Sequence, residues 1–71
     1  MLRQLNISTY KISPEQVKNT FRRFGPYGPV YQVIGISRES NEGEILMNIH
    51  IFETKENLEY PFSHILNDPL E

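Results

Sequence analysis

Two adjacent arginines stand among aromatic residues in the first half of the chain, and this grouping is the best suited to chemistry with a partner. Guanidinium groups can hold phosphates while nucleic-acid bases stack on aromatic rings. Aromatic, proline-bearing loops on small sheets also form grooves for extended peptides. The candidate partner-binding residues are Arg22, Arg23, Phe24, Tyr27 and Tyr31, with Phe21 beside them.

The segment Phe24–Val33, FGPYGPVYQV, contains two Gly-Pro steps three residues apart. Each proline fixes φ and removes a backbone donor, and the residue before it is disfavoured in the α region. The segment therefore predicts a stiff corner that turns the chain into a strand. In the functional interpretation, Tyr27 lies exposed at the tip of this corner and contacts a partner.

The residue types do not favour catalysis. His50 and His64 are the only imidazoles, and the chain has no cysteine. Ser63 and His64 are adjacent, so they cannot face each other as nucleophile and base on a regular element. The histidines together with Glu44 or Glu53 do not follow a known metal-ligand spacing. We expect a protein that is not an enzyme, with no catalytic residue, no metal and no cofactor.

Length and composition predict one small domain. Seventy-one residues form a core that contributes only about 3 to 5 kcal/mol of net stability, so self-association would help by burying more surface. The absence of cysteine suits a reducing compartment. No stretch approaches the roughly 18 apolar residues of a membrane span. We expect a cytoplasmic protein that is not bound to a membrane.

The net charge of −2 conceals an uneven distribution along the chain. Residues 1–38 hold six of the seven lysines and arginines, whereas residues 39–71 hold eight of the nine acidic residues. This split indicates a basic surface for an acidic partner, or two complementary surfaces that meet. In a third interpretation, the two halves fold together and their charges intermix.

The first part of the chain is the least regular. Residues 1–12 have no clean apolar period and are assigned to an N-terminal arm, which is frayed, an edge strand or a docking segment. Ser13, Pro14 and Gln16 then form a helix start with a capping box. We predict a short helix over 14–20 and extended chain from about Thr20, with a strand at Thr20–Phe24 as the alternative.

Three later segments alternate as strands do. They are Val30–Ser37, Glu44–Thr54 and the stretch that contains Leu58, Tyr60 and Phe62. The second is the clearest, and places Ile45, Met47, Ile49 and Ile51 on one apolar face. Pro61 lacks a ladder donor, which predicts that this strand is an edge strand or that it ends at Pro61.

These segments predict an α+β fold over residues 13–71. A three-stranded antiparallel β-meander follows a short helix and is followed by a C-terminal helical turn that contains Ile65 and Leu66. If Thr20–Phe24 is a strand, the sheet curls into a small SH3-like barrel.

The spacing Phe24-Gly25-Pro26, Gly28-Pro29, Tyr31, Val33 (FGPxGPxYxV), followed by Phe52-Glu53-Thr54, Tyr60 and Asp68-Pro69, resembles a family of short uncharacterised bacterial proteins. The resemblance covers about residues 20–69. It implies no activity, because the family has none assigned.

The function best supported by the sequence is a protein-interaction or regulatory module that self-associates. Its partner is a second copy or another protein. The alternative is a nucleic-acid-binding accessory protein that uses Arg22, Arg23 and the neighbouring aromatic residues.

Overall fold

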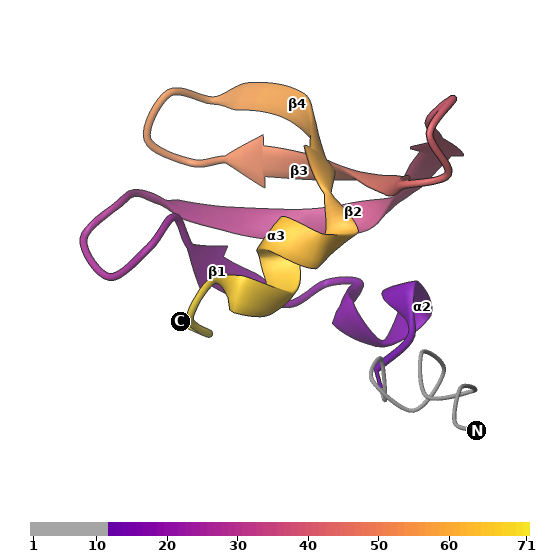
Figure 1. Ribbon diagram of the computed structural model, residues 1–71. Coiled ribbons are helices and arrows are strands. Elements are labelled where there is room, and N and C mark those ends of the chain that lie inside the picture. The colour runs from indigo at the N-terminus through magenta and orange to yellow at the C-terminus, as the bar shows by residue number, and fades with distance from the viewer. Residues whose placement is uncertain (1–11) are drawn as a thin grey trace.

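The structure is a computed structural model that describes residues 12–71, so the N-terminal arm predicted for residues 1–12 lies almost wholly outside the described residues. The elements follow the order α2 (Pro14–Val17), β1 (Phe21–Arg23), β2 (Val30–Glu39), β3 (Ile45–Ile51), β4 (Glu56–Pro61) and α3 (Phe62–Asn67). The strands form one antiparallel sheet in the order β1-β2-β3-β4 (Figure 1).

The predicted α+β meander is confirmed, with four strands where three were expected. The additional strand is β1, which corresponds to the alternative at Thr20–Phe24. The described sheet is open, because β1 and β4, the first and last strands in the order, do not pair with each other. The SH3-like barrel is therefore not formed by the described residues.

β1 is too short to show a period in the sequence, and neighbours on both sides hold it extended. On one side Phe21 pairs with Gln32 and Arg22 pairs with Tyr31. On the other side the C-terminal segment forms a bridge between Arg22 and Leu70. The Arg23 N–H donates to the Pro69 carbonyl at 3.1 Å, and the Glu71 N–H donates to the Phe21 carbonyl at 2.8 Å.

α2 begins where the sequence predicts but ends earlier than the predicted residue 20. The Ser13 N–H donates to the Gln16 side-chain oxygen at 2.7 Å, which is one half of the expected capping box. Asn19 has a φ of 68°, and its N–H donates to the Val33 carbonyl at 2.7 Å. Pairing with β2 thus ends the helix after a single turn.

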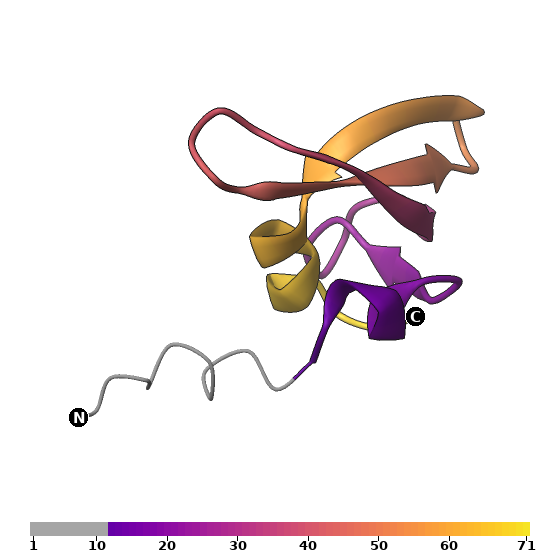
Figure 2. The same ribbon diagram turned by 90° about the vertical axis from the view of Figure 1, so that its right-hand side faces the viewer.

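The core lies between one face of the sheet and helices α2 and α3, which both cover that face (Figure 2). The predicted apolar face of β3 is confirmed, since Met47, Ile49 and Ile51 are buried and Ile45 packs against them. The other buried apolar residues are Val17, Tyr31, Val33, Phe62 and Ile65.

The last strand ends at Pro61, which is one of the two outcomes that this proline predicts. Phe62 is the first residue of α3 rather than part of the strand, because Pro61 is the N-cap of this helix. Phe62 and Ile65 then point into the core. β4 is an edge strand, as Pro61 indicates. Among the described helices, none has the length and apolar character needed to cross a membrane.

Candidate protein-interaction site

The FGPYGP corner joins β1 to β2 and projects from one end of the sheet (Figure 1). The Phe24 N–H donates to the Pro29 carbonyl at 3.1 Å and closes the corner. Gly25 has a φ of 63°, which favours glycine. A Cβ on Gly28 would overlap the carbonyl oxygen of Phe24, so only glycine fits there without movement of the backbone. The corner is rigid for these reasons.

Asp68, which follows α3, anchors the corner to the body of the protein. Its Oδ1 accepts from the Gly25 N–H at 3.2 Å. Its Oδ2 accepts from the Tyr31 hydroxyl at 2.7 Å and from the Tyr60 hydroxyl at 3.1 Å. One carboxylate therefore joins the corner, β2 and β4.

The tyrosines that contact Asp68 titrate above their ordinary range. Burial raises the pKa of Tyr31, and its hydrogen bond to the Asp68 carboxylate raises the pKa further. Burial, followed by the negative charge of Asp68, raises the pKa of Tyr60 to about 12. Both hydroxyls therefore stay protonated near neutral pH and donate to Asp68.

Phe24, Tyr31 and Tyr60 form an aromatic cluster beneath the corner. The Phe24 ring centroid lies 4.5 Å from that of Tyr31 and 5.1 Å from that of Tyr60. The Tyr31 and Tyr60 centroids are 5.6 Å apart in an edge-to-face arrangement, which is favourable for aromatic rings. His64 of α3 lies against Tyr60 at 5.6 Å. The corner is thus packed as well as hydrogen-bonded.

Arg22 lies on the core side of β1 and is only 7% exposed. Its Nη1 donates to the carbonyl of Ile65 at 3.0 Å and to that of Asp68 at 3.2 Å. The guanidinium therefore binds carbonyls at the C-terminal end of α3, where the helix dipole favours a positive charge. Its Nε is buried and has no hydrogen-bond partner among the described residues.

Arg23 points the other way and is partly exposed. It forms an ion pair with Glu71 at 2.8 Å, and its Nη1 donates to the Gly28 carbonyl at 3.1 Å. It therefore supports the corner from the side opposite to Arg22.

Tyr27 is the one predicted partner-binding residue that the structure leaves fully in solvent, with 96% of its surface exposed. Of the others, Arg22 and Tyr31 are buried and hold the corner in place, Phe24 packs in the aromatic cluster, and Arg23 is paired with Glu71. The structure thus brings the five predicted residues together, but four of them hold the corner in place and only Tyr27 is fully exposed.

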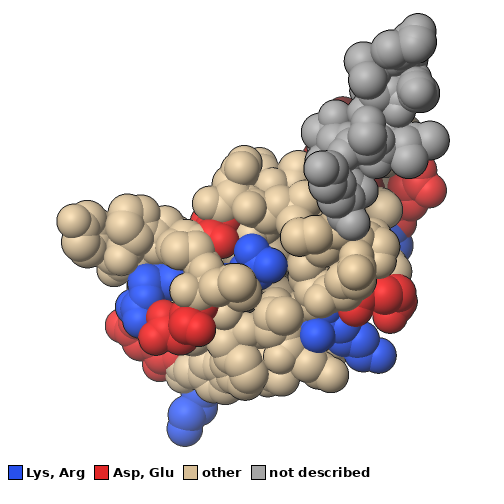
Figure 3. Space-filling model, turned by 90° about the horizontal axis from the view of Figure 1, so that it is seen from below, with Lys and Arg blue, Asp and Glu red and all other residues tan. Residues whose placement is uncertain are grey.

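The uneven charge distribution along the sequence is largely compensated within the molecule. Arg22 and Arg23 contact the C-terminal segment, and Arg38 forms an ion pair with Glu59 at 3.0 Å. On the face shown in Figure 3, basic and acidic side chains lie beside one another. The described part of the chain thus follows the interpretation in which the charges of the two halves intermix.

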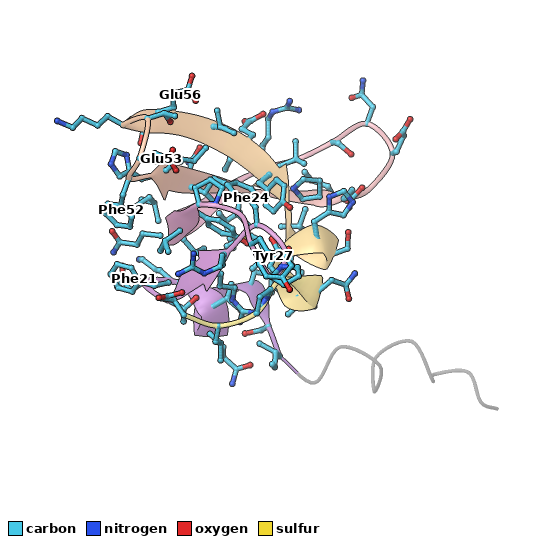
Figure 4. All side chains as sticks on the ribbon, turned by 90° about the vertical axis from the view of Figure 1, so that its left-hand side faces the viewer. Phe21, Phe24, Tyr27, Phe52, Glu53 and Glu56 are labelled. Carbon is cyan, nitrogen blue, oxygen red and sulfur yellow. The ribbon has the colours of Figure 1, made fainter. Side chains whose placement is uncertain are left out.

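Sequence reasoning missed that Phe21 pairs with Phe52 on the surface of the sheet. They are 44% and 42% exposed and stack with centroids 5.8 Å apart. Figure 4 shows them on the side of the sheet away from α3. The available signal was the alternation in β1, because Phe21 must face away from the core if Arg22 faces toward it.

The histidines have ordinary side-chain neighbours. His50 Nδ1 lies 2.8 Å from the Asn57 side-chain oxygen, and His64 packs on Tyr60. Within residues 12–71 there is no group of three or more His, Cys, Asp or Glu residues that could hold a metal ion.

Comparison with known protein families matches residues 9–71 to DUF5397, a family of unknown function. The chain belongs to this family. The match begins ahead of α2, so the family's unit includes the helix as well as the sheet and the corner. Among curated proteins, none matches the chain.

Proposed function

We propose that this protein is a non-enzymatic interaction module that associates with itself and presents Tyr27 to a partner protein. The observation that supports the proposal is the combination of a fully exposed tyrosine with a rigid support. An exposed aromatic ring on a mobile loop would lose conformational freedom on binding. Here the fold has already restricted the loop, so less affinity is lost.

The support for Tyr27 extends from its neighbours to the core. Gly25 is bonded to Asp68, and the Gly28 carbonyl accepts from Arg23. Both anchors flank Tyr27 and leave its own side chain in solvent. Tyrosine is enriched among the residues that dominate binding energies, because it combines a large apolar ring with a hydroxyl.

Nucleic-acid binding is less well supported than protein binding. The two arginines that would contact phosphates are engaged with Ile65, Asp68 and Glu71. A labelled single-stranded oligonucleotide is therefore expected to show no change in fluorescence anisotropy at low salt. Low-salt binding that is lost in Arg23→Ala would favour the nucleic-acid function instead.

The partner-presenting role is tested by affinity capture with the full chain immobilised and a lysate of cells that naturally produce it. Wild type is expected to retain a specific protein, and Tyr27→Ser to lose it. Loss of an interface tyrosine at a binding hot spot weakens affinity by about 30-fold. The matched control is Ile36→Ser, which removes an exposed apolar side chain on β2, outside the corner.

Equal recovery by wild type and Tyr27→Ser, or no recovery by either, would contradict this role. Recovery by wild type and Ile36→Ser, but not by Tyr27→Ser, would support it.

A further inference from the structure

The face of the sheet turned away from α2 and α3, here called the outer face, carries an uncharged row that crosses all four strands. Register places Phe21 opposite Gln32, Gln32 opposite His50, and His50 opposite Asn57. Because side chains alternate along each strand, this row lies on the side opposite to the buried Arg22, Tyr31 and Ile51. Both described helices cover that other side (Figure 2).

Two exposed aromatic rings stack on the outer face beside the polar, uncharged side chains of the row. Phe21 and Phe52 come from β1 and from the residue after β3, and their nearly parallel rings are inclined by 13°. His50 contacts Phe52 edge-on at 5.2 Å and is held by Asn57. About two fifths of each phenylalanine remains in solvent. Phe21 lies in β1, and Phe52 lies in the turn directly after β3, where its N–H still donates to the Val30 carbonyl of β2 at 3.3 Å.

Two of the basic side chains beside this row are paired with opposite charges. Arg23, which alternates with Arg22, is paired with Glu71, and Arg38 is paired with Glu59 across the sheet. Glu53 lies in the β3–β4 turn and Glu56 is the first residue of β4, both beyond Phe52 (Figure 4), with Lys55 between them in the sequence. Rim positions of this kind remain solvated in interfaces.

This distribution of charge favours one kind of occupant. A strongly basic or acidic partner would find no matching charge at the centre of the outer face. The outer face of a second copy of this chain would place no like charge against this row. It would add its own aromatic rings and neutral amides to the contact. The outer face is therefore complementary to itself, as a two-fold interface requires.

We propose that the outer face is the surface through which two copies of this chain associate, with the rings of Phe21 and Phe52 packed against those of the second copy. This inference rests on the self-association in the proposed function and names its interface. Two sheets would then pack face to face, each with helices on its other side. A four-stranded face is small, so the expected dimer is weak, with a dissociation constant in the micromolar range.

The test is sedimentation equilibrium of the full chain over about three decades of concentration around the micromolar range. Gln32→Lys and Gln32→Glu each place a charge at the middle of the row, where it meets the same charge on the second copy. Each variant alone is expected to raise the dissociation constant by at least about tenfold. Mixing the two variants is expected to restore association, because opposite charges then face each other.

Phe52→Ser provides an independent variant that removes exposed apolar surface without adding charge, and it should also weaken the dimer. Tyr27→Ser is the matched control, since it removes an exposed aromatic side chain outside the outer face and should leave the dissociation constant unchanged. Far-UV circular dichroism establishes that each variant is folded before its mass is interpreted.

A dimer that is equally strong in wild type, Gln32→Lys and Phe52→Ser would overturn the outer-face interface but leave self-association standing. A monomer at every concentration would overturn both, while the capture of a partner through Tyr27 would be unaffected. A mixture of the two Gln32 variants that stays monomeric would also contradict the proposal.

Discussion

One carboxylate, that of Asp68, accepts hydrogen bonds from donors in three parts of the chain: Gly25 in the corner, Tyr31 in β2 and Tyr60 in β4. The sequence shows these residues but not their convergence, because Tyr31 and Asp68 are 37 positions apart. An aspartate before a proline is typical of a helix end, so the sequence does not indicate that Asp68 also accepts these hydrogen bonds. The burial of Arg22 is not predicted by the sequence either, since an arginine beside aromatic residues more often lies in solvent.

Replacement of Asp68 by alanine is expected to destabilise the protein. It leaves the hydroxyl of the buried Tyr31 without an acceptor and removes two further hydrogen bonds. The free energy of unfolding should fall by about 2 to 4 kcal/mol, as measured by urea denaturation. Tyr60→Phe is the control and should lose about 1 kcal/mol. An unfolding midpoint for Asp68→Ala equal to that of wild type would contradict the anchoring role.

Stability is expected to fall as the pH rises above 10. Tyr60 has a pKa of about 12 in the folded protein, compared with 10.0 for an unperturbed tyrosine. Between these values the folded chain binds more protons than the unfolded chain, so stability decreases as the pH rises through this window. The decrease would be measured by the urea midpoint of unfolding at a series of pH values from about 8 to 11.5. Tyr60→Phe should show a shallower decrease, whereas an identical slope would contradict the assignment.

At the scale of elements, the corner depends on glycine for two different reasons. Gly25 needs a positive φ, whereas Gly28 needs space. The sequence predicts the corner itself, because two Gly-Pro steps exclude helix and central strand. It also predicts β2, β3 and β4, and in β2 and β3 the alternation of side chains matches burial on one face. It does not predict β1 securely, since three residues are held there by partners distant in the sequence.

Gly28→Ala is expected to lower the free energy of unfolding by about 1 to 3 kcal/mol, because the new methyl group would overlap the Phe24 carbonyl. Gly35→Ala is the matched control, since its Cβ would meet only the Lys18 side chain at 3.9 Å. Its stability should stay close to that of wild type in the same thermal and urea scans. If the two variants lose equal stability, the close packing of the corner is not what Gly28 provides.

In the molecule as a whole, the C-terminal segment returns to the first strand of the sheet. Residues 69–71 lie along β1 and complete its hydrogen bonding, so one edge of the sheet is covered by the chain itself. The contact also positions the corner, since Arg23 binds both Glu71 and the Gly28 carbonyl. This closure explains how a small domain holds Tyr27 rigidly.

Removal of residues 69–71 is expected to loosen β1 more than the rest of the sheet. The Arg23 amide would lose its acceptor on Pro69, so its hydrogen exchange should become faster. Exchange at the buried Ile49 of β3 should change much less. Glu71→Gln removes only the exposed ion pair and is expected to change stability by about 1 kcal/mol or less. Equal acceleration at Arg23 and Ile49 would contradict a local role.

Whether Tyr27 contacts a partner is tested most directly by site-specific photocrosslinking in cells that naturally produce the protein, with a benzophenone amino acid in place of Tyr27. A discrete crosslinked product between the chain and another protein is expected when the photoreactive group is at position 27. The same group in place of Ile36 should give no such product. No product from position 27, or the same products from both positions, would contradict the claim that the corner presents Tyr27 to a partner.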